Sequence, residues 1–328
     1  MTTTTASRDI AVLSAHRVVT EAETTRSLEE MIFEVTSAAL EAAGLDHASL
    51  DGVVLSGQDQ TDGRVISCMT SAGPASGVDR DTTMIASSGE HALIYGWMRL
   101  LSGQGRNVLV VGWSKPSESV DPDRAELVSA EPFVLRPTGM NATLAAALQA
   151  SRWTPPHTTV DDVVAWPLGV CDLPARADAV YAFVLTVADA VGDRTPRAWI
   201  HGAGWSTEAY ELGSRDLATP TALLQAVERL GDAPGVSEWD TVEIAAPSEP
   251  AVRHVVDAIG VDPSAAVNPS GSLRESPAPP HVAGLGRMFA ALDAVSAAPG
   301  PRVAAGIGLH GFAGQGATVL VVSNKKKG

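Results

Sequence analysis

The feature that most constrains the fold is an alternation of short apolar runs with longer amphipathic segments. Apolar runs at 8–15, 50–57 and 106–113 predict buried strands. Between them, 27–45 predicts an amphipathic helix opened by a capping box, and the stretch 84–101 predicts a sharp turn followed by a second helix. That second helix carries Ile94, Trp97, Met98 and Leu101 on one face. Strands that alternate with helices in this way predict a layered α/β sheet.

The same alternation resumes in the second half of the chain, after a stretch with less periodicity. Residues 114–178 are richer in Pro, Asp and Trp and contain short periodic pieces at 141–150 and 159–164, so we expect a connecting or capping segment. Beyond it we expect helices at 219–230, 248–259 and 281–296, and strands at 180–187, 197–204, 240–246, 302–310 and 316–323.

The two halves of the sequence contain similar segments in the same order. In 44–57 a segment that follows a helix ends in a strand led by Asp51, and 231–246 repeats this order with Asp240; each then reaches a glycine-containing turn, a helix and a closing strand. A duplicated βα unit explains the similarity. We therefore expect an N-terminal half over 1–178, with 114–178 as its loop or cap segment, and a C-terminal half over 179–328.

Composition excludes several classes of partner. The 328 residues carry a formal net charge of -15, so polyanions such as nucleic acid and anionic membrane surfaces would be repelled. Cys68 and Cys171 are too few for a disulfide framework and lack metal-ligand spacing, which predicts a reducing compartment, the cytoplasm by default, and no metal site. No apolar run reaches the length of a membrane span or an export signal.

Five stretches, in a fixed order, carry a resemblance to a known family. They read ASSGEHALIYGWMRLLSGQGRNVLVVGW (86–113), WPLGVCDLPARADAVYAFVL (166–185), VEIAAPSEPAV (242–252), NPSGSLRESPAPPHVAG (268–284) and HGFAGQGATVLVV (310–322). Together they resemble the signatures of the thiolase superfamily, in particular the sterol-carrier-protein-type thiolases. The resemblance implies a thiolase fold, in which two βαβαβ halves stack as α/β/α/β/α layers. The segment 141–166 is shorter than this family supplies, which implies a reduced lid.

The residues that carry the family's chemistry are replaced. In the register of the resemblance, Ala86 stands at the nucleophilic cysteine, while Ala245 and Ala278 stand at two histidine positions; His281, three residues further on, does not replace the second of these. A methyl group holds neither an acyl group nor a proton. The resemblance therefore implies that thiolytic and condensing activity has been lost.

His310 occupies the position of the family's second cysteine and is the candidate that remains for acid–base chemistry. As a general base it would work with Asn268 and with backbone amides near Gly311 and Gly314 as oxyanion donors; the alternative is a histidine that packs a vestigial pocket. We expect Ser87 and Ser88 to cap the following helix and His91 to face solvent or a partner subunit. The remaining pocket or substrate-binding candidates are Gly89, Ser270, Gly271, Phe312, Gly314 and Gly316.

These observations predict a non-condensing partner subunit of a heteromeric complex that processes acyl thioesters. The resemblance implies coenzyme A or a carrier protein as the carrier of the substrate, with no covalently bound cofactor. It also implies dimerisation through 64–113, as a homodimer or as a heterodimer or heterotetramer with a catalytic thiolase-like subunit, and a possible zinc-ribbon/OB-fold partner. One alternative is an aldolase, C–C lyase or acyltransferase that uses His310 as base; another is a plain ligand-binding protein. Bacterial secondary metabolism or lipid degradation is the setting that the family suggests.

Overall fold

The central feature of the computed structural model, which describes residues 9–59, 62 and 67–327, is a ten-stranded sheet built from two five-stranded parts. The two parts join where Ile10–Val12 pairs with Ala198–Ile200. The first part contains β1 (Ile10–Thr20), β2 (Gly52–Gly57), β3 (Asp81–Met84), β4 (Asn107–Ser114) and β7 (Asp178–Val187). The second contains β8 (Ala198–Thr207), β9 (Thr241–Ala245), β10 (Ala266–Val267), β11 (Val303–His310) and β12 (Gly316–Ser323).

The two parts have the same strand order. The first runs β3-β2-β4-β7-β1 and the second runs β10-β9-β11-β12-β8, so each places its third, second, fourth, fifth and first strand side by side. In both, the first three of these strands are parallel and the other two pair antiparallel. An identical order and an identical pattern of direction are what a duplicated unit produces.

The position of β7 corrects the expected division of the chain at 178/179. β7 pairs along its length with β1 and β4, so it is the fifth strand of the first half rather than the opening strand of the second. The reason is that the segment between Ser114 and Asp178 is an insertion between the fourth and fifth strands. Its change in composition marks that insertion, not a boundary between the halves.

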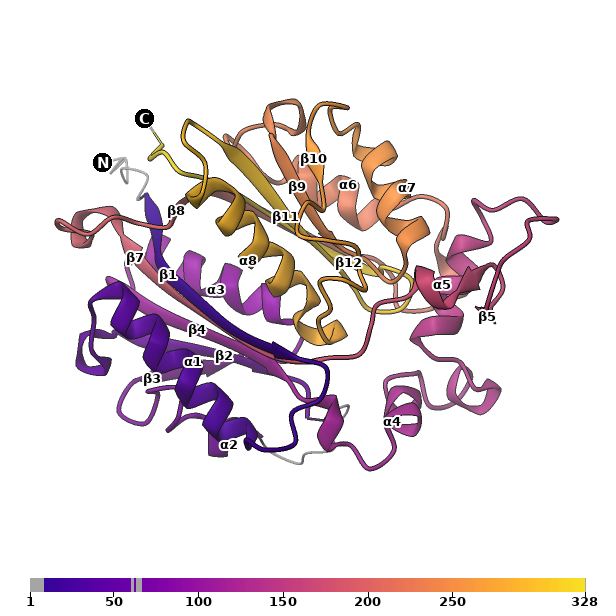
Figure 1. Ribbon diagram of the computed structural model, residues 1–328, viewed down its shortest axis with the longest axis horizontal. Helices are drawn as coiled ribbons and strands as arrows, with labels where there is room; N and C mark the ends of the chain where they lie inside the picture. Colours follow the sequence, from indigo (N-terminus) through magenta and orange to yellow (C-terminus); the bar gives the residue numbers. More distant parts are fainter. Residues whose placement is uncertain (1–8, 60–61, 63–66, 328) are drawn as a thin grey trace, which may run out of the picture.

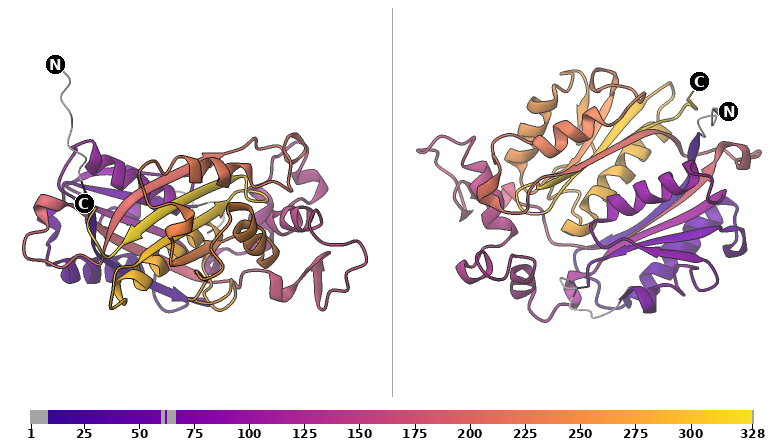
Figure 2. Two further views of the ribbon diagram at one scale, coloured as in Figure 1. Left: turned by 90° about the horizontal axis from the view of Figure 1, so that it is seen from above. Right: turned by 180° about the vertical axis from the view of Figure 1, so that it is seen from behind.

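Helices form three layers around the two parts of the sheet, which confirms the expected α/β/α/β/α arrangement (Figures 1 and 2). On the outer face of the first part lie α1 (Leu28–Ala43) and α2 (Ser67–Ser71); α3 (Gly89–Leu101) and α8 (Ala283–Ser296) lie between the two parts; α6 (Thr221–Glu228) and α7 (Glu249–Ile259) cover the outer face of the second. The predicted capping box is present at the start of α1, where Ser27 and Glu30 bond each other's main chain.

The central helix α3 is buried on more sides than an amphipathic surface helix. Leu93, Ile94 and Leu100 are fully buried in the core shared by both halves, whereas Trp97 and Met98 are only partly buried against it. The predicted apolar face was therefore one part of a wider buried surface. Contacts with a sheet on one side and with α8 on the other explain this, because they leave few directions open to solvent.

The insertion between β4 and β7 extends from one end of the molecule, at the right of Figure 1. It contains α4 (Pro122–Val128), α5 (Ala142–Ala150), β5 (Val163–Ala165) and β6 (Leu168–Gly169). The segment is held to the second half by Trp153, whose ring stacks on His254 and whose indole N–H donates to the carbonyl oxygen of Ala218. Several large apolar side chains on it are exposed, namely Val120, Phe133, Val134, Val163, Val164 and Trp166.

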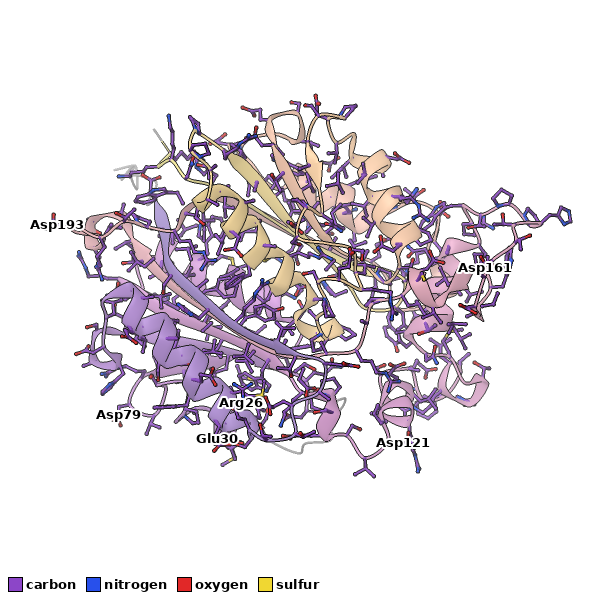
Figure 3. All side chains as sticks on the ribbon, viewed as in Figure 1. Arg26, Glu30, Asp79, Asp121, Asp161 and Asp193 are labelled. Atoms are coloured by element: carbon purple, nitrogen blue, oxygen red, sulfur yellow. The ribbon has the colours of Figure 1, made fainter. Side chains whose placement is uncertain are left out.

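Several acidic side chains lie at the periphery of the molecule. Figure 3 shows Asp79, Asp121, Asp161 and Asp193 at the periphery of the molecule, on four different loops or element ends. Within the described part of the chain, no helix combines the length and the apolar character needed to cross a bilayer.

Candidate active site

Three elements from distant parts of the sequence meet at one point between the two sheets. The first turn of α3, the first turn of α8 and the carboxyl end of β11 approach so closely that only glycine fits at the contacts. A Cβ on Gly89 would lie 2.7 Å from Leu285 Cδ1, and one on Gly308 would lie 3.0 Å from the Cα of Gly284. The sequence thus uses glycines to bring the start of α3 into contact with residues nearly two hundred positions away.

The turn that precedes α3 does not cap the helix in the expected way. Ser88 is the N-cap residue, with extended φ and ψ of -162° and 157°, but its side chain makes no capping hydrogen bond and its hydroxyl is buried without a partner. Ser87 is exposed, and its Oγ lies 2.8 Å from Nδ1 of His91 instead. The prediction that both serines cap α3 is therefore wrong, because an imidazole four residues ahead binds the first hydroxyl.

His91 faces inward rather than toward solvent or a partner, which corrects a second expectation. Its ring meets that of His310 edge to face, with 4.7 Å between the ring centres. Burial, together with the nearby His310, lowers the pKa of His91 below its ordinary value of 6.5. The imidazole is therefore predominantly neutral at pH 7 and able to accept a proton.

Behind these rings lies a buried acid. Glu90 is 1% exposed, and its Oε1 is 3.4 Å from Nδ1 of His310. Gly284 and Gly308 enclose the carboxylate, since a Cβ on them would lie 2.5 Å and 2.7 Å from its atoms. Burial raises the pKa of Glu90, but the close approach of the His310 imidazole outweighs burial, so that the pKa is held below the ordinary value of 4.5.

His281, at the start of α8, supports the same turn from the opposite side. Ser56 Oγ donates to the carbonyl oxygen of Ile85, so its lone pairs face His281, whose Nε2 is 2.9 Å away and donates to it. Burial, in the first place, lowers the pKa of His281 to about 4, which leaves the ring uncharged at neutral pH. Because Ile85 immediately precedes Ala86, this bond holds the position of the turn.

Asn268 does not lie free for oxyanion binding, contrary to the sequence-based expectation. Its Oδ1 accepts from the amide of Ile244 at 2.6 Å and its Nδ2 donates to the carbonyl oxygen of the same residue at 3.2 Å. The side chain therefore continues the hydrogen bonding of β9. Its backbone φ of 45° shows a left-handed conformation, which asparagine tolerates well.

The loop after Asn268 is anchored by a second buried acid. Glu243 accepts from the amide and the hydroxyl of Ser270, at 3.0 Å and 2.7 Å, and from Nη1 of Arg287 at 2.9 Å. Arg287, which is 3% exposed, also donates to the carbonyl oxygens of Gly271 and Ser272. Ser270 and Gly271 are thus held in a structural clamp.

The three alanines at the positions of the expected catalytic residues lie on separate segments, before α3, at the end of β9 and before α8. Ala86 is exposed on the turn before α3, and Ala245 pairs with Gly308, which packs on Glu90. Ala278 is half-buried and lies near Gly286 on α8, where a Cβ would be 3.6 Å from it. None of the three side chains bears a group that transfers a proton or an acyl chain.

The other predicted pocket residues have mainly structural roles. Phe312 is buried with Ala130 and Ala145, and so joins β11 to the insertion rather than lining a pocket. Gly314 adopts a φ of 62° in the turn that follows. Gly316 lies under His310, where a Cβ would be 2.1 Å from Nε2, so this glycine makes room for the imidazole.

A groove of about 860 Å³ opens beside the loop that Ser270 belongs to. Arg17, Arg176 and Arg274 line it, together with Glu21 and Glu275. Three guanidinium groups on one groove stand out in a chain with a net charge of -15. As for metals, within the described residues no three or more His, Cys, Asp or Glu side chains are arranged to hold an ion.

Sequence reasoning identified His310 but missed Glu90, His91 and His281 as its neighbours. A sequence signal existed for Glu90 only in the apolar, core-facing character of its helix, because an acidic residue is common in the first turn of a helix, where the helix dipole favours it. For the two histidines no such signal existed. Their proximity depends on how the starts of α3 and α8 pack against β11, which no local pattern encodes.

Comparison with known proteins identifies the architecture. No family model matches the sequence, and a search of curated proteins finds no relative. Among solved structures, human mitochondrial 3-ketoacyl-CoA thiolase in complex with CoA is similar, with a TM-score of 0.76 and 16% identity over 96% of this chain and 98% of that chain. A second structure of human mitochondrial 3-ketoacyl-CoA thiolase matches with a TM-score of 0.75 and 15% identity over the same shares. The chain therefore has the thiolase fold.

Proposed function

We propose that this protein is a non-condensing, thiolase-like subunit of a heteromeric cytoplasmic complex that processes acyl thioesters. The observation that carries the proposal is the turn before α3, which presents Ala86 and Ser87 where the family resemblance expects a thiolate. Ala245 and Ala278 replace two further catalytic positions in that resemblance. A carbon–carbon bond cannot be formed through a cysteine-bound acyl group at such a turn.

The substrate class follows from the fold and from the charge of the groove. One similar structure is a 3-ketoacyl-CoA thiolase solved with CoA. The groove lined by Arg17, Arg176 and Arg274 offers donors for phosphate oxygens. The similar CoA-bound structure and the arginine-lined groove both support a thioester carried on coenzyme A or on the phosphopantetheine arm of a carrier protein.

Two surfaces support the expectation of partner subunits. β3 ends the sheet, and its outer edge pairs with no other strand of the described chain. Phe133 and Val134 on the insertion are 87% and 68% exposed, and Val120 is fully exposed. Free sheet edges and exposed large apolar side chains are features of surfaces that another chain covers. A homodimer, a heterodimer or heterotetramer with a catalytic thiolase-like subunit, or a zinc-ribbon/OB-fold protein are the candidate partners.

The test compares the chain alone with the chain mixed with the products of its neighbouring genes. We expect no thiolysis of acetoacetyl-CoA by the isolated chain, a heteromer by light scattering after chromatography, and turnover by the mixture that is unchanged in a His310→Ala variant. The proposal is contradicted if the chain forms no complex with any product of its neighbouring genes, or if the isolated chain thiolyses acetoacetyl-CoA.

A second candidate function is an atypical lyase or acyltransferase with His310 as general base. The specific observation in its favour is the buried Glu90 beside His310, because a buried acid that contacts an imidazole is a common way to orient a base. Turnover of β-hydroxyacyl-CoA by the isolated chain that falls at least 10²-fold in His310→Ala would support this function. Equal turnover by the variant would exclude it.

A further inference from the structure

We propose that Ser87 is a nucleophile and His91 its general base, so that the turn before α3 forms an acyl-serine from an activated ester or thioester. This activity goes beyond the proposed function, which concerns association and the absence of condensation. Acyl transfer to a serine requires neither a cysteine nor the alanine-substituted histidine positions. The inference gives Ser87 a chemical role in place of the sequence-based expectation that it caps the helix.

The geometry of the pair meets the first requirement for such chemistry. Ser87 Oγ lies 2.8 Å from His91 Nδ1, within the range that lets an imidazole take the hydroxyl proton. The serine is exposed while the imidazole is half-buried behind it. A substrate can thus reach the oxygen, and the base is screened from bulk water.

A third and a fourth group hold the base in place. The ring of His91 contacts that of His310 at 4.7 Å, and His310 in turn lies 3.4 Å from the buried Glu90. No hydrogen bond joins the acid to the base, since Nε2 of His91 is buried without a hydrogen-bond partner; Glu90 acts on His91 through its negative charge, which favours the imidazolium that forms when the serine proton is taken. The lowered pKa of His91 keeps its imidazole in the neutral form that accepts a proton.

The start of α3 supplies stabilisation for the developing negative charge. The first amides of a helix have no acceptor within the helix, and at α3 the side chain of Ser88 does not cap them, while the carboxylate of Glu90 accepts from the amide of Glu90 alone. They lie immediately beside Ser87 in the chain, and the helix dipole adds positive potential at this end. An oxyanion formed next to Ser87 would accept hydrogen bonds from them.

The reaction balances as a two-step transfer. Ser87 Oγ bonds to the carbonyl carbon of the acyl group, the bond to the leaving thiolate or alkoxide breaks, and the serine proton passes to His91 and then to the leaving group. Water, deprotonated by His91, next attacks the acyl-serine; the carboxylic acid leaves and Ser87 regains its proton. The sum is the hydrolysis of one ester or thioester, with no redox partner.

The test uses a fluorophosphonate probe on the full chain, because this probe reacts with a base-activated serine by loss of fluoride. We expect one probe per chain, found by fragment mass spectrometry on Ser87 in the tryptic peptide 81–99. Ser87→Ala should abolish labelling. In His91→Gln, where the amide can bind the hydroxyl but cannot take its proton, the labelling rate should fall about 10²-fold or more.

Ser102→Ala is the matched control, because Ser102 is an exposed serine at the other end of the same helix. It should label like the wild type, and circular dichroism should show all three variants folded. No labelling of the folded wild type, labelling at another residue, or an unchanged rate in His91→Gln would each overturn the proposal. Because these measurements use the isolated chain, they are independent of whether a partner subunit is found.

Discussion

Two buried carboxylates in this molecule have opposite environments. Glu243 accepts three hydrogen bonds, from the amide and the hydroxyl of Ser270 and from Arg287. Glu90 is equally buried, but its contact with His310 is 3.4 Å long and its Oε2 has no hydrogen-bond partner in the structure. A fully satisfied buried acid is typical of a structural clamp, and an incompletely satisfied one points to function.

The difference separates a structural part of the site from a candidate functional part. The clamp around Glu243 fixes the loop from Asn268 to Ser272, and the hydrogen bonds that form it involve no histidine. Glu90 fixes no loop in this way, yet Gly284 and Gly308 leave room for its carboxylate. A buried, incompletely hydrogen-bonded acid beside an imidazole is the physical reason to expect chemistry here rather than in the clamp.

The largest expected effect comes from breaking the clamp. Arg287→Ala leaves Glu243 buried without its counterion, so the free energy of unfolding should fall by about 3–5 kcal/mol. Urea denaturation followed by circular dichroism measures this change. Arg302→Ala is the control, since it breaks an exposed ion pair with Asp240 and should cost at most about 1 kcal/mol. Equal losses in the two variants would show that burial does not distinguish the pairs.

The next effect concerns pH and the imidazole that supports the turn. The folded pKa of His281 is about 4, below its ordinary value of 6.5, so the unfolded chain binds a proton first as the pH falls through this window. The free energy of unfolding should therefore decrease as the pH falls from 6.5 to 4, by about 3 kcal/mol from this one group.

His281→Gln provides the comparison, because the amide can still donate to Ser56 but does not titrate. The unfolding free energy of the wild type should fall relative to that of the variant as the pH is lowered from 6.5 to 4. A constant difference across that range would mean that His281 titrates alike in both states.

A smaller effect is expected at the glycines around Glu90. In Gly308→Ala the new Cβ would lie 2.7 Å from Glu90 Oε1, and the overpacking should lower stability by about 1–3 kcal/mol. Gly300→Ala places its Cβ where no atom lies within 4 Å and should leave stability unchanged. Thermal melts of the two variants test this, and a neutral Gly308→Ala would show that the Glu90 site is loosely packed.

The smallest effect is expected for the incompletely paired acid itself. Glu90→Gln removes one long contact, so the free energy of unfolding at pH 7 should fall by about 1 kcal/mol. Because the pKa of Glu90 is held below its ordinary value of 4.5, its charge stabilises the fold above that pH and is neutralised below the folded pKa. The curves of wild type and variant should therefore converge at acid pH. A loss of unfolding free energy at pH 7 as large as that of Arg287→Ala would show that Glu90 and Glu243 do not differ in their contribution to stability.

Much of the secondary structure was predictable because it is encoded locally. The capping box of Ser27 and Glu30, the apolar runs of the strands and the turn before α3 are signals within a few residues. The assignment of β7 to the first half was not predictable in this way. An insertion of more than sixty residues separates it from β4, and pairing across such a distance depends on the whole sheet.

The candidate site likewise has features that are encoded locally and features that depend on the tertiary structure. The sequence by itself determined that Ala86 cannot act as a nucleophile and that His310 ends a strand, because these statements depend on residue type and order. Only the tertiary structure decided that His310 meets His91 and Glu90, that Asn268 is bound to β9, and that Ser87 faces an imidazole. The physical reason is that hydrogen bonds and close packing act over a few ångströms in space, whereas these groups lie on separate elements whose relative placement is set by the core.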